Sequence, residues 1–531
     1  MKTFMNFRLF AAVGMIAMAL SVFSSCKKDD ETKPAPQVSS DPTSFNLVPG
    51  QTETASITVV APGSFTSLTV SADQGTAVLS AISGTDTESG SATLTYTAPD
   101  AEGNYTITLS AVDNLMQTGT KTISVSVAAK PAVNVPAGEV SGTWDANTTY
   151  IAQGALLVPA GKSLTIEEGV TIIFDGDGSS AAPELAVSGS LYCMGTENNP
   201  ILITVPSAKR TQANIFAGIW GGIQGLPDAS EMVLQYTNIE YVGAPTGPGN
   251  SSLYSGSPYD DGDPRYGVLF SNTDGKFVMQ HSSISYTADD GMRIVGGTIL
   301  ISNNTFVLNG KNGGESVNIK SGVTGTVAFN MSYRAATNAY KWSNSSGTSP
   351  NPQTDIACYN NTAVDGGWRQ TKTGRGGSIN IEKGARGAAY NNLIVNCRFG
   401  LKVVGDADFS NLSIGYSHYY GTDTVMSNQF YPKDGIMVAG DKETASDIAG
   451  TPGQYDPMFK SYTVSNYTSA YPVDPLSLGY MPEGSDFSLQ SGAPGISAGK
   501  TSFTIMPSIS AKGTSYSAPS PASFIGAFGA N

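Results

Sequence analysis

Histidine, cysteine and charged residues are scarce in this chain of 531 residues. It contains two His and four Cys, and Asp, Glu, Lys and Arg together make up 14%. So few His and Cys leave little room for a metal cluster built from these residues. The formal net charge of −14 excludes a general nucleic-acid-binding protein, which needs a basic surface to displace phosphate counterions. We therefore expect no nucleic-acid partner and no cofactor, apart from the Ca²⁺ considered below.

Long apolar runs are also missing after the N-terminus. The first 26 residues hold an apolar stretch at 9–20, which follows Lys2 and Arg8. This stretch is too short for a membrane span, which needs about 20 residues, and it predicts a secretion signal. Residues 1–25 are predicted to be a lipoprotein signal peptide, because Ser24-Ser25-Cys26 resembles a bacterial lipobox whose Cys carries the lipid. The alternative is an ordinary signal peptide in which Cys26 occurs by chance.

The segment after Cys26 is charged and then contains proline. It begins Lys-Lys-Asp-Asp-Glu at 27–31, which resembles the surface-export signal of Bacteroidetes lipoproteins. Residues 26–38 are predicted to be a tether. The resemblance implies a protein anchored in the outer membrane by lipid and facing the cell exterior. The alternative is that 27–31 is a solvated linker without an export role.

Glycine is abundant, and short alternating runs predict β structure. The chain has 60 Gly and 29 Pro, which suits a large β protein with many turns. Between residues 39 and 129, runs such as 55–60, 105–111 and 121–127 alternate apolar and polar residues. This period of two gives strands with one buried face. Residues 39–129 are therefore predicted to be an Ig-like β-sandwich that acts as a spacer, with glycan or protein binding as the alternative role.

The pattern changes after about residue 138, where strands of three to five residues follow one another with Gly or Asn between them. An imperfect repeat recurs at 234–239, 279–284, 301–306, 328–333, 358–363 and 389–394. The third positions of these segments are 45, 22, 27, 30 and 31 residues apart. A period near 22 with variable insertions predicts a coil of stacked short strands, a parallel β-helix with loops between its rungs.

Stacked rungs place equivalent side chains about 4.8 Å apart. The repeat predicts a hydrogen-bonded ladder at one corner, formed by Asn303, Asn330, Asn360 and Asn391. His281 falls at the same corner, so we expect it to be structural. Cys358 and Cys397, together with Cys193, are expected to fill the interior; whether a disulfide forms among them stays open, because spacing cannot show it.

Three further features resemble a known group. They are the segments 164–170 (LTIEEGV) and 195–201 (GTENNPI), the Asn-Asn rungs, and tail segments such as 455–459 (YDPMF) and 525–529 (IGAFG). Together they resemble the right-handed parallel β-helix proteins of the pectin-lyase-like superfamily, and more closely the β-helix surface lipoproteins of Bacteroidetes. The resemblance implies an all-β chain, in which a small Ig-like β-sandwich precedes a large right-handed parallel β-helix with a C-terminal cap at 138–531. Lyases, hydrolases, esterases and adhesins share this scaffold, so it does not identify an activity.

Paired carboxylates are the first candidate for chemistry. Asp289 and Asp290 follow an Asn-Thr-Asp segment that ends in Asp274. Two carboxyl groups can protonate a glycosidic oxygen and activate water, and the order resembles polygalacturonase-type glycoside hydrolases. The Gly-His-Gly and Arg-Ile-Lys segments of those enzymes are missing. The alternative is a turn with solvated carboxylates.

A second acidic cluster lies in a glycine-containing loop. Asp260, Asp261 and Asp263 are close enough in sequence to offer oxygen ligands to Ca²⁺. The full EF-hand pattern is missing, so a plain acidic loop is the alternative.

A basic segment stands out in this acidic chain. Residues 366–387 (GGWRQTKTGRGGSINIEKGARG) contain five cations and one acid. Guanidinium groups match carboxylates and aromatic faces stack on sugars. The predicted ligand-binding residues are Lys341, Trp342, Trp368, Arg369, Lys372, Arg375, Lys383 and Arg386. The alternative is that these side chains pair with carbonyls and acids of adjacent rungs.

These features predict a monomeric cell-surface lipoprotein whose β-helix binds extracellular polysaccharide, in particular an acidic glycan, or another surface ligand. One alternative is a lyase or glycoside hydrolase acting on uronic-acid glycans, with the lyase favoured. A second alternative is a purely structural or adhesive surface protein. Binding is preferred because no complete catalytic motif occurs in the sequence.

Overall fold

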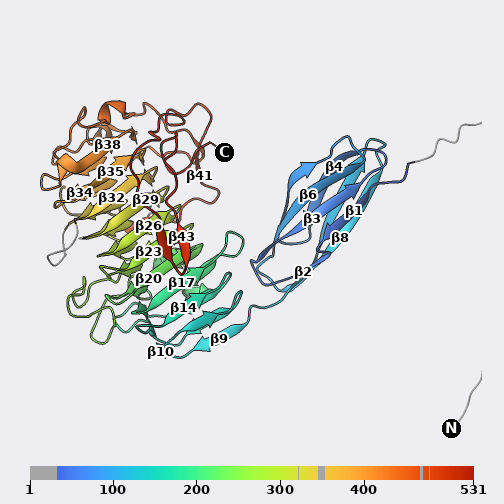
Figure 1. Ribbon diagram of the computed structural model, residues 1–531, viewed down its shortest axis with the longest axis horizontal. Helices are drawn as coiled ribbons and strands as arrows, with labels where there is room; N and C mark the ends of the chain where they lie inside the picture. Colours follow the sequence, from blue (N-terminus) through green and yellow to red (C-terminus); the bar gives the residue numbers. More distant parts are fainter. Residues whose placement is uncertain (1–32, 321, 345–352, 467–470, 478, 531) are drawn as a thin grey trace, which may run out of the picture.

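The computed structural model describes residues 33–320, 322–344, 353–466, 471–477 and 479–530 (Figure 1). The predicted signal peptide, the lipidation site Cys26 and most of the tether lie outside the described residues. In the part of the chain that is described, no helix is long and apolar enough to cross a membrane.

The N-terminal domain is a sandwich of two four-stranded sheets. One has the order β1-β3-β6-β5 and the other β2-β8-β7-β4. Burial alternates along the strands, and side chains such as Ile57 and Leu109 fill the space between the sheets. The strands are β1 (Gln37–Asp41), β2 (Ser44–Leu47), β3 (Thr52–Val60), β4 (Phe65–Ala72), β5 (Thr76–Ser83), β6 (Ser89–Thr97), β7 (Gly103–Asp113) and β8 (Thr118–Val127).

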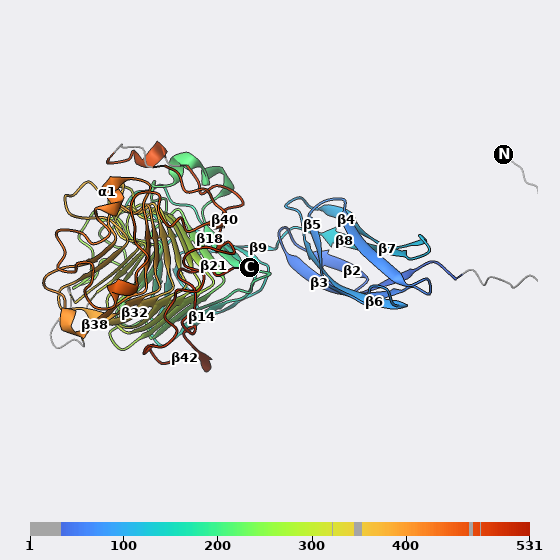
Figure 2. The same cartoon turned by 90° about the horizontal axis from the view of Figure 1, so that it is seen from above.

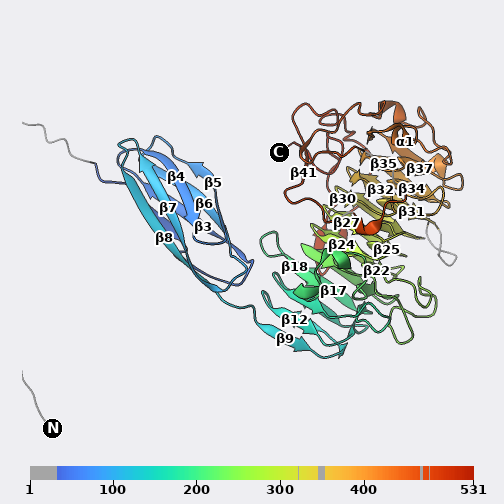
Figure 3. The same cartoon turned by 180° about the vertical axis from the view of Figure 1, so that it is seen from behind.

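The remaining chain forms three long parallel sheets, and each rung contributes one strand to each sheet. This is the predicted right-handed parallel β-helix. Sheet 1 contains β10 (Gly138–Glu139), β13 (Leu156–Val158), β16 (Leu185–Val187), β19 (Ile223–Gly225), β22 (Val268–Phe270), β25 (Met292–Ile294), β28 (Val317–Ile319), β31 (Tyr340–Ser343), β34 (Ile379–Glu382) and β37 (Leu401–Val403). Figure 3 shows β22, β25, β31, β34 and β37 along one side of the coil.

The second and third sheets complete each rung. Sheet 2 contains β11 (Gly142–Trp144), β14 (Ser163–Ile166), β17 (Ser190–Met194), β20 (Glu231–Gln235), β23 (Lys276–Gln280), β26 (Thr298–Ser302), β29 (Thr324–Ala328), β32 (Asp355–Tyr359), β35 (Arg386–Tyr390) and β38 (Leu412–Gly415). Sheet 3 contains β9 (Ala132–Val135), β12 (Thr149–Ala152), β15 (Thr171–Phe174), β18 (Ile201–Thr204), β21 (Thr237–Glu240), β24 (Ser283–Thr287), β27 (Thr305–Asn309), β30 (Met331–Tyr333), β33 (Thr362–Val364), β36 (Leu393–Val395) and β39 (His418–Tyr420).

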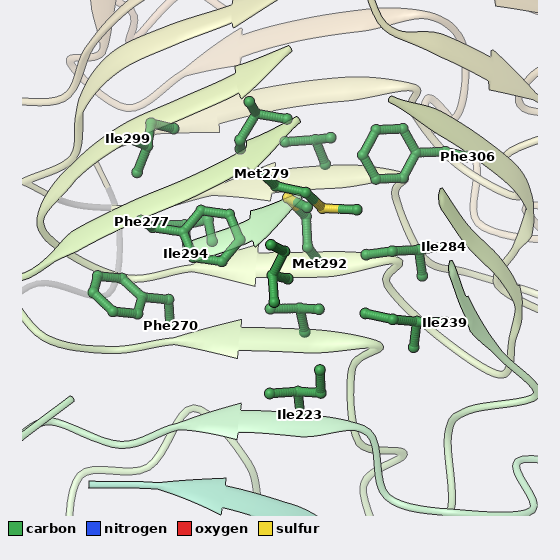
Figure 4. Packing of buried hydrophobic residues seen from close by; sticks show 14 of the residues in the cluster. Ile223, Ile239, Phe270, Phe277, Met279, Ile284, Met292, Ile294, Ile299 and Phe306 are labelled. Atoms are coloured by element: carbon green, nitrogen blue, oxygen red, sulfur yellow. The ribbon is translucent and has the colours of Figure 1, made fainter. Parts of the chain in front are cut away.

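Apolar side chains from all three sheets fill the interior of the coil. Figure 4 shows Ile223, Phe270, Met292 and Ile294 of sheet 1 packed against side chains of the other two sheets. Removing this stacked apolar surface from water is the main stabilising term. The interior also holds three free thiols, and their burial confirms that these cysteines are core residues: Cys193, Cys358 and Cys397.

The asparagine ladder exists, but its register differs from the prediction. Asn304, Asn330, Asn361 and Asn392 form the buried ladder, and each Nδ2 donates to the next Oδ1 at 3.0 Å. Of the four predicted members, Asn330 alone belongs to it. The others, Asn303, Asn360 and Asn391, precede the ladder by one residue in the left-handed region, with φ of 60°, 50° and 57°. Asn and Asp are the residues other than Gly that visit this region most readily, so the corner and the ladder both select Asn.

The left-handed corner residues have roles of their own. His281 has φ of 52° and stacks on the corner Tyr236, with ring centroids 4.8 Å apart, so its structural role is confirmed. Asn391 Nδ2 donates to Asn360 Oδ1 at 3.2 Å and to the Lys500 carbonyl at 2.8 Å. These asparagines therefore bind the returning C-terminal segment as well as each other.

The C-terminal segment from residue 455 returns along the outside of the coil (Figure 2). Phe459, Phe487 and Ile525 pack on the outer face of sheet 3. Ile509 and Tyr516 pack on sheet 2. The segment contains β40 (Phe459–Ser461), β41 (Asp486–Leu489), β42 (Ile509–Ala511) and β43 (Thr514–Tyr516). The segment thus covers two sides of the coil.

Candidate functional site

Over its last five strands, the outer face of sheet 1 carries polar side chains, whereas sheets 2 and 3 carry mostly apolar ones outside on the same rungs. Each short strand places its first and third residues inside and its middle residue outside. The parallel pairings align five middle residues in one row: Arg293, Asn318, Lys341, Asn380 and Lys402. A cation therefore alternates with an amide along five consecutive rungs.

Each cation of this row forms an ion pair with at least one carboxylate. Arg293 Nη2 lies 2.7 Å from Asp290 Oδ2. Lys341 Nζ lies 3.7 Å from Glu315 and 3.1 Å from Glu382. The Lys402 ammonium pairs with Asp434 and also donates to the Gly374 carbonyl at 2.8 Å. Lys341 thus sits between two carboxylates, both of which are largely buried.

The two carboxylates beside Lys341 differ in proton affinity. Burial, followed by the negative charge of Asp290, raises the pKa of Glu315 to about 7. Burial also opposes the charged form of Glu382, but Lys341 and a hydrogen bond from Asn380 hold the pKa of Glu382 below its usual value. The pair therefore offers one group that keeps a proton near neutral pH and one that is ionised.

Asp290 is the buried group behind Glu315. Burial alone would raise its pKa, but Arg293 and hydrogen bonds from the Glu315 N–H and Asn318 Nδ2, at 2.8 Å each, hold that pKa below its usual value. An ionised Asp290 then disfavours the charged form of Glu315. Burial, with Asp290 as the second cause, raises the pKa of Asp289 to about 8.

Two adjoining pockets open over the last three strands of this row. The first has a volume of about 270 Å³ and is lined by Glu315, Lys341, Arg375, Glu382 and Lys402, among others. The second has a volume of about 500 Å³ and includes Trp368, Arg398, Lys433 and Tyr471. They share Thr373, Gly374, Phe399 and Asp434. We call the two pockets together the sheet 1 groove.

Aromatic side chains form the wall of the second pocket. The Trp368 ring meets Tyr471 edge to face, with centroids 6.4 Å apart. Trp368 Nε1 donates to the Asn396 carbonyl at 2.7 Å. The Arg398 guanidinium lies 3.8 Å from the Tyr471 ring centroid. These contacts fix flat apolar surfaces beside the charged row, and such surfaces stack on sugar rings.

The fold places only some of the predicted ligand-binding residues in the groove. Lys341, Trp368 and Arg375 line the sheet 1 groove. Lys372 and Lys383 are exposed outside its lining.

Two of the predicted ligand-binding residues are buried and make structural contacts, which corrects the prediction for them. Trp342 is 1% exposed inside the coil, and its Nε1 donates to the Arg386 carbonyl at 3.0 Å. Arg369 is 2% exposed and donates to the carbonyls of Asn309, Gly310 and Lys311. Since its partners are backbone carbonyls of an earlier rung, Arg369 ties two loops together.

Arg386 also lies away from the groove. It belongs to β35 of sheet 2, where its Nε pairs with Asp355 at 2.8 Å and its Nη1 donates to Gln353 at 3.2 Å. The alternative interpretation, pairing with groups of adjacent rungs, therefore holds for this residue.

The structure does not bring Asp274 together with Asp289 and Asp290. Asp274 is exposed on the turn after β22, whereas Asp289 and Asp290 precede β25. Because β22 and β25 are adjacent and parallel, Asp274 lies beyond the C-terminal ends of the sheet 1 strands. The Asp pair lies beyond their N-terminal ends. The Asp pair instead belongs to the ion-pair network of Arg293.

The acidic loop does not form a metal cluster. The Asp263 carboxylate accepts a hydrogen bond from the Asp260 N–H at 2.9 Å, and Asp261 is exposed. In the described portion of the chain, no group of three or more His, Cys, Asp or Glu side chains is placed to hold a metal ion.

Several groove residues were not anticipated. They are Glu315, Asn380, Glu382, Phe399, Lys402, Asp434 and Tyr471. A signal for the row was present in the sequence. Each row residue is the polar centre of an apolar triplet, as in Val317-Asn318-Ile319 and Leu401-Lys402-Val403. The carboxylates and aromatic residues come from loops of unlike length, for which no period exists.

The match to a protein-family model agrees with the fold. A family model described as a pectate-lyase-like beta helix domain matches residues 138–429. The chain belongs to this family. Among solved structures, it is similar to a family 28 exopolygalacturonase from Yersinia enterocolitica, at 11% identity and a TM-score of 0.20, over 73% of this chain and 95% of that chain. No curated protein matches it.

Proposed function

We propose that the β-helix binds an acidic polysaccharide in the sheet 1 groove, on a monomeric protein that lipid at Cys26 holds at the outer face of the outer membrane. The observation that carries the proposal is the pair of row cations Lys341 and Lys402, which line the groove two rungs apart with Arg375 beside them. Alternate rungs are about 10 Å apart. A polymer with recurring carboxylates can meet several of these cations at once.

The charge of the groove supports this ligand class. Its lining contains five cations and three acids, although the whole chain has a net charge of −14. The raised pKa of Glu315 removes part of the negative charge near neutral pH. Cations beside aromatic walls attract uronic-acid units and stack on their rings. Proteins of the pectate-lyase-like family are named for action on an acidic plant polysaccharide, which agrees with this choice.

Affinity electrophoresis tests the proposal. The soluble chain, without residues 1–26, is run in gels that contain polygalacturonate, alginate or an uncharged glucan. We expect retardation by at least one uronic-acid polymer. Replacing the exposed groove cations, Arg375→Ala with Lys433→Ala, should weaken binding roughly tenfold or more, since each charged contact contributes about 1 kcal/mol.

The matched control removes the same charge outside the groove. Lys372→Ala with Lys383→Ala changes the net charge equally, and both side chains are exposed. This variant should bind like the parent. Equal weakening by both double variants would contradict a groove site and indicate a general charge effect. Lack of retardation by every polymer would contradict polysaccharide binding and favour an adhesive or structural role.

The Glu315–Lys341–Glu382 arrangement favours cleavage of the polymer as a second candidate function. A carboxyl group that keeps its proton near neutral pH can protonate the glycosidic oxygen, and an ionised neighbour can act as base or nucleophile. New ultraviolet absorbance would identify elimination, and new reducing ends without that absorbance would identify hydrolysis. Glu315→Gln should abolish either activity, whereas Glu483→Gln, in a distant loop, should not. Retardation in the gel without new chain ends would indicate binding without cleavage.

A further inference from the structure

Three turns gather at one end of the sandwich. They are residues 61–64, 84–88 and 113–117. The Asn114 N–H donates to the Ser64 carbonyl at 2.9 Å, and the Phe65 N–H donates to the Thr87 carbonyl at 2.7 Å. The turns therefore form one continuous surface at this end.

The chain enters the sandwich at the same end. Gln37, the first residue of β1, pairs with Val60, which immediately precedes the first of these turns. Lys33 forms an ion pair with Glu88, on the second turn, at 3.6 Å. Figures 1 and 3 show that β1 begins at the end of the sandwich remote from the β-helix. Six residues separate Cys26 from Lys33, so lipid at Cys26 would lie within about 25 Å of this surface.

Apolar side chains are exposed on this surface. Met116 is 89% exposed, Leu115 53% and Val60 50%. The turn 114–117 reads Asn-Leu-Met-Gln and carries no charge. An exposed apolar hairpin tip of this kind has no role in the core of the sandwich.

The backbone makes Met116 an unfavourable choice for stability. Its φ is 60°, in the left-handed region where Gly or Asn is accommodated at lower cost. The thioether contributes no burial in return. Strained positions with exposed apolar side chains are typical of interaction sites.

We propose that Leu115 and Met116 insert into the interface of the phospholipid bilayer that holds the lipid of Cys26. This inference rests on the proposed lipid anchor, because the anchor brings this end of the sandwich to the membrane. An uncharged tip can enter the boundary between headgroups and acyl chains, where Leu and Met are favourably buried. The lipid and the tip would then hold the sandwich at two points, with its turn end toward the membrane.

A fluorescent label at the tip tests the insertion. Full-length lipidated protein with Met116→Cys is labelled with the environment-sensitive dye NBD and reconstituted into vesicles of phosphatidylethanolamine and phosphatidylglycerol. Lipid blocks Cys26, and the other three thiols are buried, so the dye attaches to residue 116 alone. We expect the label to emit at a shorter wavelength in vesicles than on the same labelled chain, without its lipid, in buffer. We also expect brominated lipids to quench this emission.

The control label lies at the other end of the same strand. Glu102 is exposed just before β7, whereas Met116 follows the last residue of that strand. Eleven residues of extended chain place the two labels about 35 Å apart. Glu102→Cys should therefore show neither the spectral shift nor the quenching. Quenching at both positions would indicate general adsorption and would overturn the proposal.

The failure of the tip and the failure of the anchor are distinguishable. Mass spectrometry of the membrane fraction reports whether Cys26 is lipidated, and Cys26→Ala should release the protein. A lipidated chain whose label at 116 is unshifted overturns the insertion alone. An unmodified Cys26 overturns the anchor and the insertion together, and it leaves the groove proposal unaffected.

Discussion

Asn303 and Asn304 are adjacent in sequence, yet they have different roles in the structure and should contribute differently to stability. Asn304 is 1% exposed and belongs to the buried ladder. Its Oδ1 accepts from the Ser282 N–H at 3.0 Å, and its Nδ2 donates to the Met279 carbonyl at 2.9 Å and to Asn330 Oδ1 at 3.0 Å. Asn303 is exposed and serves the left-handed corner. The substitution of each by Ala therefore separates the ladder from the corner.

The magnitudes follow from the partners that are lost. Asn304→Ala removes the acceptor of a buried N–H, which costs about 1–3 kcal/mol, and two further hydrogen bonds at about 1 kcal/mol each. The expected loss in the free energy of unfolding is about 4 kcal/mol. Asn303→Ala loses mainly the tolerance of Asn for the left-handed backbone, about 1 kcal/mol. The expected difference between the two variants is about 3 kcal/mol.

Urea unfolding followed by tryptophan fluorescence measures this difference. All four Trp lie between residues 144 and 368, so the signal reports the β-helix and not the sandwich. The midpoint should fall much further for Asn304→Ala than for Asn303→Ala, with unchanged slope. If Asn303→Ala were as destabilising as Asn304→Ala, the ladder would not be the stabilising feature, and the corrected register would be refuted.

Two further predictions concern residues that sequence reasoning placed differently or left without a full role. Arg369→Met should lower the free energy of unfolding by about 2–4 kcal/mol, because three backbone carbonyls lose a charged donor. The folded fraction of this variant should still be retarded by polysaccharide in affinity gels. Normal stability with lost retardation would instead show that Arg369 is a ligand-binding residue. His418 is buried, and burial lowers its pKa to about 4, so its protonation in the unfolded chain removes stability as pH falls from about 6.5 to 4. The advantage of the parent over His418→Gln should therefore shrink by about 3 kcal/mol between pH 7 and pH 4, and a pH-independent difference in denaturant unfolding would contradict a neutral buried imidazole.

The sequence predicted the coil because its interior repeats. Stacking requires an apolar residue at equivalent positions of every rung, and this demand recurs along the chain whatever the loop lengths. The corner was located to within one residue. The ladder was mis-registered by one residue on three of the four predicted rungs, whereas at Phe329 and Asn330, Phe takes the left-handed position and Asn the ladder position. A local pattern of two adjacent Asn does not distinguish these roles, because the corner and the ladder both select Asn.

The site was predicted less completely. Three of the predicted ligand-binding residues, Lys341, Trp368 and Arg375, line the groove. The basic segment also contains Arg369, whose guanidinium is buried against carbonyls. Charge in the sequence does not report burial, so a structural cation and a solvent-facing one look alike. Glu315 and Glu382 were missed because their association depends on the rung stacking that brings both to Lys341.

The sequence by itself determined an all-β chain, the change from alternating longer strands to short repeated ones, and the placement of the scarce cysteines in the interior. The tertiary structure alone decided which outer face stays polar. The C-terminal segment covers apolar outer surface of sheets 2 and 3, and the last three residues of the polar row of sheet 1 line the groove. The physical reason is that a local pattern records the preference of each residue for burial, whereas the partner that provides the burial can lie hundreds of residues away.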